Sequence, residues 1–282
     1  MCFYETGRQL WVHSFLLCYL SSPLTEPFAA YAGKRAARYD SESTYDKGDR
    51  QRQYQILVDV VRYAGRPHYE FCDLGCGTGY FTRAFFEVDA QCRGIALDAS
   101  SEMLDVARAK LQACAERTEF VCLRFEDIPW PRWRGQFDVV FSALAIHHLD
   151  DRDKWRLFGD IAGALRPDGI FILYDLIRHR DPRDGALIEH LACRDMQRRL
   201  MAYLDLNWEP PDLSIEAIIE KDRFLRAREG DNEAPLDDQL QALVDAGFSS
   251  TVLFQDARIV GLCCRKAPVR CWTAKAGQQA II

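Results

Sequence analysis

The strongest chemical signal in the sequence is the segment 73–79, which reads DLGCGTG. It directly follows a predicted strand and opens a predicted helix, which is the placement that a dinucleotide-type binding loop requires. The glycines Gly75, Gly77 and Gly79 let the backbone approach a ligand without a Cβ in the way. The free N–H groups at the start of the helix attract an anionic group. The segment therefore predicts a ligand-binding loop.

The acid at the start of this loop narrows the choice of ligand. The charge of Asp73 would repel a pyrophosphate, and the GxGxG spacing differs from the GxGxxG of dinucleotide-binding loops. A cationic ligand would be attracted instead. S-adenosylmethionine carries an ammonium, a sulfonium and a carboxylate, so it matches both the acid and the free N–H groups. For the same reasons a nicotinamide cofactor is the weaker alternative.

Further acids follow the next two predicted strands. Asp98 ends the second strand and is placed to accept hydrogen bonds from two ribose hydroxyls. Glu126 and Asp127 come just after the third strand and offer an acceptor for an adenine amino group. Because the carboxyl ends of parallel strands meet at one edge of a sheet, we expect these acids and the glycine loop to line one site.

The candidates for acid–base chemistry follow the fourth and fifth predicted strands. His147 and His148 come after the fourth strand, where an imidazole could take a proton near neutral pH. Asp175 ends the fifth strand and could orient a second ligand. The alternative for these residues is structural: a histidine that shapes the loop, and an aspartate that caps a helix. No metal site is predicted, because no set of cysteines and histidines has the spacing of a zinc site.

Short apolar runs that alternate with helical patterns must position these residues. The predicted strands cover 69–74, 93–97, 119–123, 137–142 and 170–174. The predicted helices cover a segment from residue 50, then 80–87, 101–115 and 153–165, and a turn follows over 166–169. This alternation predicts parallel strands with crossover helices.

The alternation of predicted strands and helices changes after the fifth predicted strand. Two charged helical patterns come first, over 184–205 and 214–229, and they look inserted rather than part of the core. A helix and two strands that could form an antiparallel hairpin follow, over 236–246, 249–254 and 258–264. The prediction is a doubly wound, seven-stranded, mostly parallel sheet with one reversed strand at its edge and a helical insert between the fifth and sixth strands.

These features together resemble the class I S-adenosylmethionine-dependent methyltransferases. The resemblance covers about residues 31–266 and rests on DLGCGTG, the strand end at Asp98, the Glu126–Asp127 pair and the stretch FDVVFSALAIHHL to LRPDGIFILYDL. It implies a Rossmann-like domain that transfers a methyl group from S-adenosylmethionine to an O, N or C nucleophile of a small molecule. By resemblance, the donor is bound by Tyr39, Asp73, Gly75, Cys76, Gly77, Gly79, Asp98, Ala99, Met103, Glu126, Asp127, Ile128 and Ser142. His147 and Asp175 are the candidate catalytic residues, and the segment with Tyr31 and Tyr39 resembles a lid over the donor.

Composition limits the alternatives. An apolar content of 48% over 282 residues is typical of a globular chain with one elaborated domain. Lys and Arg number 36 against 42 Asp and Glu, and this net charge of −6 argues against a nucleic-acid partner. The 11 cysteines lack paired spacing, which favours reduced thiols in the cytoplasm. A tRNA or protein acceptor, or a non-catalytic S-adenosylmethionine-binding module, are the alternative functions.

The ends of the chain are predicted to lie outside the domain. Residues 1–30 form an N-terminal extension that is either disordered or packed on the domain. Its apolar run 11–20 covers about half a membrane span and lacks a clear cleavage site, so no membrane segment or signal peptide is expected. The methyltransferase domain covers 31–266, with a helical lid insert over about 180–232, and 267–282 form a tail.

Overall fold

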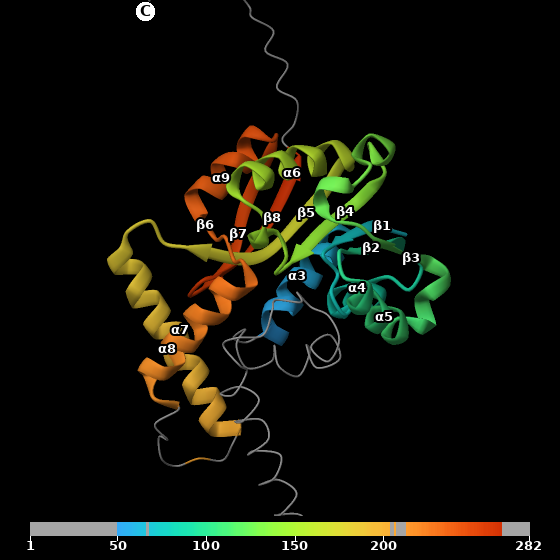
Figure 1. Ribbon diagram of the computed structural model, residues 1–282. Coiled ribbons are helices and arrows are strands. Elements are labelled where there is room, and N and C mark those ends of the chain that lie inside the picture. Colours follow the sequence, from blue (N-terminus) through green and yellow to red (C-terminus); the bar gives the residue numbers. More distant parts are fainter. Residues whose placement is uncertain (1–49, 66–67, 204–205, 207–212, 267–282) are drawn as a thin grey trace, which may run out of the picture.

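The computed structural model describes residues 50–65, 68–203, 206 and 213–266, and Figure 1 shows a central sheet with helices on both sides. The strands are β1 (Glu70–Leu74), β2 (Arg93–Asp98), β3 (Thr118–Cys122), β4 (Phe137–Ala143), β5 (Leu165–Arg178), β6 (Ala234–Pro235), β7 (Phe248–Asp256) and β8 (Ile259–Lys266). The α-helices are α3 (Arg50–Ala64), α4 (Tyr80–Val88), α5 (Ser101–Lys110), α6 (Asp151–Ala164), α7 (Pro182–Tyr203), α8 (Ile215–Glu229) and α9 (Leu236–Asp245). Short 3-10 helices are η1 (Gln112–Arg117), η2 (Phe125–Asp127), η3 (Trp130–Trp133) and η4 (Ile146–His148).

The sheet has the strand order β3-β2-β1-β4-β5-β8-β7, and the two-residue β6 pairs with β5. The pairs among β1 to β6 are parallel, whereas β8 is antiparallel to both β5 and β7. The predicted doubly wound, mostly parallel sheet is therefore confirmed, with β6 added to the seven expected strands. The prediction of a reversed strand at the edge is wrong, because β8 lies inside the sheet and β7 forms the edge. The first six residues of β8 are buried, whereas β7 carries the exposed polar side chains that suit an edge strand.

Alternate residues of the central strands point to opposite faces of the sheet and divide the core in two. On one face, Phe71 and Phe141 pack against Phe85 of α4 and against α3. On the other face, Leu74 and Leu173 belong to a cluster with α6 and α9. Figure 1 shows α6 and α9 on one side of the sheet and α3 and α4 on the other. The helices therefore bury both faces, as an α/β sheet requires.

Side-chain caps fix where two helices begin after the strand ends. Ser100 accepts a hydrogen bond from the N–H of Met103 at the start of α5. Asp150 accepts one from the N–H of Asp153 at the start of α6. Both residues satisfy an N–H group that has no partner within its helix. The loops between strand and helix are consequently short, so the residues at the carboxyl edge of the sheet are held by regular elements on both sides.

Strand β5 begins earlier than the sequence predicts. Its first residue, Leu165, pairs with Phe137 of β4, and the pairing resumes with Ile170 opposite Val139. The predicted turn 166–169 lies between these two paired segments, with Asp168 in the left-handed region at φ +63°. The turn is therefore a bulge inside a long strand, which lengthens β5 at its N-terminal end.

Helices α7 and α8 leave the sheet after β5 and return to it at β6, so the predicted helical insert is confirmed. Buried Cys193, Met196 and Leu200 of α7 pack with Ile215 and Ile218 of α8 in a small core of their own. The pair extends to one side of the sheet in Figure 1. Among the helices of the described segments, none has the length and hydrophobicity needed to span a bilayer.

Candidate active site

The glycine loop after β1 adopts a backbone that only glycine tolerates well. Gly75, Gly77 and Gly79 have φ values of +75°, +53° and +74°. A Cβ on Gly75 would lie 2.3 Å from the Cβ of Ala145, just before η4. A Cβ on Gly77 would meet nothing within 4 Å among the residues that the structure describes. The loop is therefore packed tightly against the segment after β4 at Gly75 and borders open space at Gly77.

Asp73 lies in β1 directly before this loop and is 1% exposed. Its Oδ2 accepts a hydrogen bond from the hydroxyl of Thr82 in α4, whereas Oδ1 has no hydrogen-bond partner within the described part of the chain. Burial raises the pKa of the Asp73 carboxyl to about 8, although the bond from Thr82 acts in the opposite direction. The site thus holds a buried acid with one unused oxygen, which is suited to a hydrogen-bonding cation.

Asp98 ends β2 and holds the glycine loop in place. Its Oδ2 accepts a hydrogen bond from the N–H of Gly77 at 2.8 Å, and its Oδ1 accepts one from the N–H of Ser100 at 2.8 Å. Burial raises the pKa of Asp98, and these two bonds oppose the shift. Each carboxylate oxygen has a second lone pair, so the group could still accept hydrogen bonds from a ligand.

Four other predicted donor-site residues are buried near the strand ends. The hydroxyl of Ser142 in β4 donates to the carbonyl of Leu74 at 2.7 Å, so this residue joins β4 to the end of β1. Cys76, Met103 and Ile128 belong to the buried core. The pKa of the Cys76 thiol is raised well above its ordinary value, mainly by burial. These four residues are uncharged and buried, so they contribute packing and hydrogen bonding rather than charge.

The remaining donor-site predictions lie at the surface or outside the described residues. Ala99 follows β2 and is exposed, as are Glu126 and Asp127 in η2 after β3. They follow the neighbouring strands β2 and β3 at the same sheet edge, as the sequence predicts. Tyr39 and Tyr31 lie outside the residues that the structure describes.

The two predicted catalytic residues form one buried pair. The Nδ1 atom of His147 in η4 lies 2.5 Å from Oδ1 of Asp175 in β5, and the backbone N–H of His147 donates to Oδ2 at 3.0 Å. The side chains are 4% and 2% exposed. Burial alone would lower the pKa of His147, but the Asp175 carboxylate outweighs it, and the pKa rises to about 9. Because Ala145 contacts the glycine loop two residues earlier, the pair lies beside that loop.

A second carboxylate reaches this pair from the far end of the insert. Oδ1 of Asp231, which follows the glycine that ends α8, lies 3.5 Å from Nε2 of His147 and 3.4 Å from Nδ1 of His148. The N–H of Asn232 donates to the carbonyl of His147 at 2.8 Å, and the buried ammonium of Lys154 donates to the carbonyl of Asn232. Sequence reasoning missed Asp231, because only the folding of the insert brings it here.

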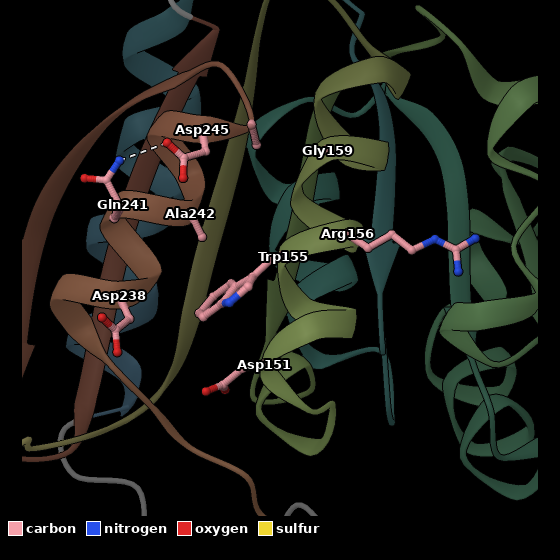
Figure 2. A pocket seen from close by; sticks show the side chains of 9 residues that line it. Asp151, Trp155, Arg156, Gly159, Asp238, Gln241, Ala242 and Asp245 are labelled. Atoms are coloured by element: carbon pink, nitrogen blue, oxygen red, sulfur yellow. Dashed lines mark hydrogen bonds between the residues drawn. The ribbon is translucent and has the colours of Figure 1, made fainter.

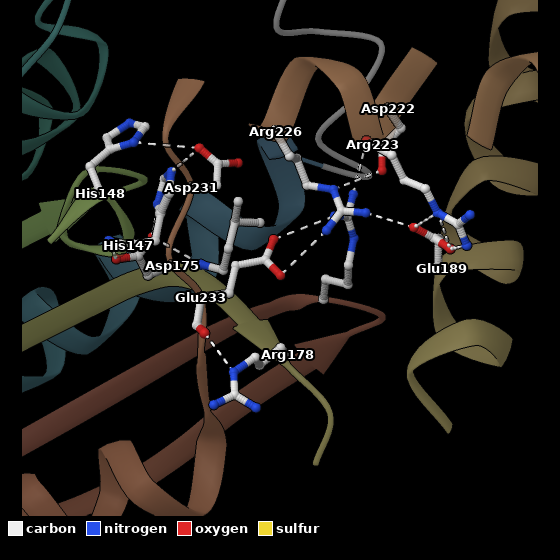
Figure 3. A network of polar contacts seen from close by, with 12 residues as sticks. His147, His148, Asp175, Arg178, Glu189, Asp222, Arg223, Arg226, Asp231 and Glu233 are labelled. Carbon is white, nitrogen blue, oxygen red and sulfur yellow. Dashed lines mark hydrogen bonds and ion pairs between the residues drawn. The ribbon is translucent and has the colours of Figure 1, made fainter. Parts of the chain in front are cut away.

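Figure 3 shows that Asp231 borders a cluster of charged side chains. We term it the arginine cluster, and its members are Glu189, Asp222, Arg223, Arg226, Glu233 and Arg258. Arg226 of α8 lies 2.6 Å from Glu189 of α7 and 3.0 Å from Asp222. Arg258, before β8, lies 3.1 Å from Asp222 and 3.4 Å from Glu233. Burial acts to lower the pKa of Arg258, but its acidic partners raise it. The cluster ties both helices of the insert to the sheet beside the His147 pair.

A groove of about 500 Å³ lies elsewhere, between α6 and α9 (Figure 2). It is lined by Asp151, Trp155, Arg156, Gly159, Asp238, Gln241, Ala242, Asp245 and Ala246. Among the described residues, none of the predicted site residues lines this groove. The candidate site is therefore the carboxyl edge of the sheet, where the glycine loop meets η4.

Comparison with known proteins finds a methyltransferase-domain match in the central part of the chain. Residues 71–169 match a family model described as a methyltransferase domain. The CurJ carbon methyltransferase has a similar fold, with a TM-score of 0.62 at 16% identity, covering 94% of this chain and 71% of that chain. The matched range 71–169 contains the glycine loop, Asp98 and His147, but it ends before Asp175 and the insert.

Two further proteins that are similar to this chain extend the comparison. A Bacillus subtilis protein named as an uncharacterized methyltransferase is 28% identical over 159 residues, which are 56% of this chain and 58% of that protein. The chain thus spans less than two thirds of that relative. The 1,6-didemethyltoxoflavin-N1-methyltransferase of Burkholderia thailandensis, solved with S-adenosylhomocysteine, has a TM-score of 0.51 at 18% identity. That match covers 86% of this chain and 93% of that enzyme.

Proposed function

We propose that this chain transfers the methyl group of S-adenosylmethionine to an O, N or C nucleophile of a small molecule. The observation that carries the proposal is the buried carboxylate of Asp73 beside the glycine loop. A buried oxygen without a hydrogen-bond partner costs free energy, and an ammonium or sulfonium group nearby would offset that cost. The donor carries both cations, whereas a pyrophosphate would add repulsion.

The proposed donor site extends from the glycine loop toward β3. Asp98 accepts the ribose hydroxyls with the lone pairs that Gly77 and Ser100 do not use. Glu126 and Asp127 are exposed after β3, where they can accept a hydrogen bond from the adenine amino group. The order of these acids along the sheet edge matches the order of methionine, ribose and adenine in the donor.

The His147–Asp175 pair serves the acceptor side. Methyl transfer from a sulfonium is a direct displacement, so the protein contributes mainly by aligning the two reactants and excluding water. The contact between Ala145 and the glycine loop supports a position for η4 next to the proposed donor site. Asp175 holds both the backbone and the ring of His147, which leaves Nε2 as the ring atom directed away from the sheet core. We assign this pair to positioning the acceptor.

A small acceptor is favoured by charge and by the relatives. The net charge of −6 weakens attraction to a nucleic-acid backbone. The Burkholderia thailandensis enzyme of similar fold was solved with the small molecule 1,6-didemethyltoxoflavin bound. The insert of α7 and α8 lies next to His147 through Asp231, so it is the part of the chain that would shape an acceptor pocket.

A pair of glycine variants tests donor binding. Gly77→Ala and Gly135→Ala each place a Cβ at positive φ with nothing within 4 Å among the described residues, so the backbone strain of the two variants is similar. Calorimetric titration should show micromolar S-adenosylmethionine binding by the wild type and Gly135→Ala, and at least about tenfold weaker binding by Gly77→Ala. NADH serves as the negative control. Equal affinity in both variants would refute the donor site.

Turnover is tested with a labelled methyl group. The donor is incubated with the protein and pools of small molecules, tRNA or peptides, and label transfer is counted. Label in the small-molecule pool alone is expected. Label in another pool overturns the acceptor class, and donor binding with no transfer to any pool favours a non-catalytic binding module.

A further inference from the structure

Three side chains beside the proposed acceptor site offer ligand atoms to one point. One nitrogen or oxygen atom from each of His147, His148 and Asp231 lies within 4.8 Å of the other two. The sequence predicted no metal site, because no set of its cysteines and histidines has the spacing of a zinc site. Asp231 comes from the end of the insert and could not be paired with the two histidines by spacing.

The two oxygen–nitrogen separations match those of ligands that share an ion. Oδ1 of Asp231 lies 3.5 Å from a nitrogen of His147 and 3.4 Å from a nitrogen of His148. These distances exceed the usual range of about 2.7–3.2 Å for an N–H···O hydrogen bond. Two ligands that each lie about 2.1 Å from a tetrahedral ion are about 3.4 Å apart. The oxygen and either nitrogen are therefore spaced to share an ion.

The surroundings hold these ligands in place. Oδ1 of Asp175 holds Nδ1 of His147, which fixes the tautomer and leaves Nε2 as the coordinating atom. A carboxylate that holds the second nitrogen of a ligating histidine is the usual outer contact of protein metal sites. Asp231 is 6% exposed, and the bond from Asn232 to the carbonyl of His147 ties its segment to η4.

The neighbouring arginines are already matched to acids. Arg226 contacts Glu189 and Asp222, and Arg258 contacts Asp222 and Glu233. Arg223 also contacts Glu189, so the arginine cluster has three arginines for three acids and balances its own charge. Asp231 and Asp175 together bring two negative charges to the two imidazoles, which is a favourable charge for a divalent cation.

We propose that His147, His148 and Asp231 bind a divalent transition-metal ion, with Asp175 as the outer carboxylate. Two imidazoles and one carboxylate suit Zn²⁺, Fe²⁺, Mn²⁺ or Co²⁺ and leave coordination positions for water or an oxygen of a bound molecule. An ion here would lie beside the glycine loop and could bind an oxygen of the acceptor. The inference does not depend on methyl transfer, because metal binding can be measured without donor or acceptor.

The test is a Co²⁺ titration of the full chain without an affinity tag, after removal of metals by a chelator. Ligand-field absorption reports binding, and the lack of a thiolate charge-transfer band excludes the cysteines as ligands. The variants are His148→Gln and Asp231→Asn, and His190→Gln on the exposed side of α7 is the matched control. We expect one equivalent of Co²⁺ to bind the wild type and the control, and binding at least about tenfold weaker in both site variants.

An outer-contact variant adds a second readout. Asp175→Asn should weaken Co²⁺ binding about 10- to 100-fold and shift the absorption spectrum, as loss of an outer carboxylate does at other sites. Circular dichroism confirms that each variant is folded, and His148, at 26% exposure, is the substitution that disturbs the core least. Failure of the wild type to bind Co²⁺ or Zn²⁺, or equal binding in His148→Gln, would overturn the proposal.

Discussion

Replacing Asp73 by asparagine tests whether the carboxyl beneath the glycine loop is protonated in the folded chain. Burial raises its pKa from 3.8 to about 8. Between these values the carboxyl is ionised in the unfolded chain and protonated in the folded one, so unfolding releases a proton. The free energy of unfolding therefore falls as the pH rises, by about 1.4 kcal/mol per pH unit from this group. Above about pH 8 both states are ionised and the slope disappears.

The asparagine variant lacks this slope, because its amide does not titrate. The difference in the free energy of unfolding between Asp73→Asn and the wild type should grow in favour of the variant by about 3 kcal/mol from pH 5 to pH 7. The difference in the free energy of unfolding at any single pH is less informative, since the amide NH₂ of the variant would also lack a partner where Oδ1 now lies. Only the change with pH isolates the carboxyl.

Urea unfolding followed by tryptophan fluorescence at pH 5, 6 and 7 measures the difference, with equal m-values as the check on two-state behaviour. Asp245→Asn, on the exposed side of α9, is the matched control for the exchange of a carboxyl for an amide. A difference between Asp73→Asn and the wild type that stays constant with pH would show that Asp73 is ionised when folded. The burial argument and the pH dependence drawn from it would then be refuted.

Three further predictions concern the proposed donor site, the aromatic core and the arginine cluster. Between about pH 6 and pH 8, the affinity of the wild type for S-adenosylmethionine should rise by up to about tenfold per pH unit, because a cation binds the ionised form of Asp73 more tightly. Calorimetric titration of Asp73→Asn should show an affinity that lacks this pH dependence. Phe85→Ala removes a ring stacked on Phe141 at 4.2 Å and should lower the free energy of unfolding by about 3–5 kcal/mol, whereas Tyr63→Ala, 87% exposed, should change it by less than about 0.5 kcal/mol in urea titrations. Arg258→Met leaves Asp222 and Glu233 with Arg226 as their remaining arginine partner, and should lower the free energy of unfolding by about 3 kcal/mol in thermal or urea unfolding; an unchanged midpoint would contradict the structural role of the arginine cluster.

The placement of Asp73, the glycine loop and Asp98 at one sheet edge could be predicted from sequence. Asp73, the glycines and Asp98 follow consecutive parallel strands, so strand order alone brings them to one edge. The pairing of His147 with Asp175 was within reach for the same reason, since β4 and β5 are neighbours. The reversed strand was misplaced, because a hairpin pattern does not say which of its strands joins the sheet.

The rest of the site depends on long-range folding that one sequence does not reveal. Asp231 lies beside His147 in a fold in which α7 packs on α8 and Lys154 binds the backbone of Asn232, contacts between residues far apart in the sequence. Thr82, the partner of Asp73, lies on α4 among apolar residues and carries no motif of its own. Composition and spacing offer no signal for such contacts, since they are set by side chains that the fold brings together.

The insert leaves the sheet at the end of β5, three residues after Asp175, and rejoins it at β6, three residues after Asp231, so a residue that contacts His147 lies near each end of the insert. The glycine loop and Asp98 belong to a separate, earlier stretch of the chain. Selection or design could therefore replace α7 and α8 between β5 and β6 without changing the glycine loop or Asp98. Substrate choice and methyl-donor binding would then evolve as separate modules of one domain.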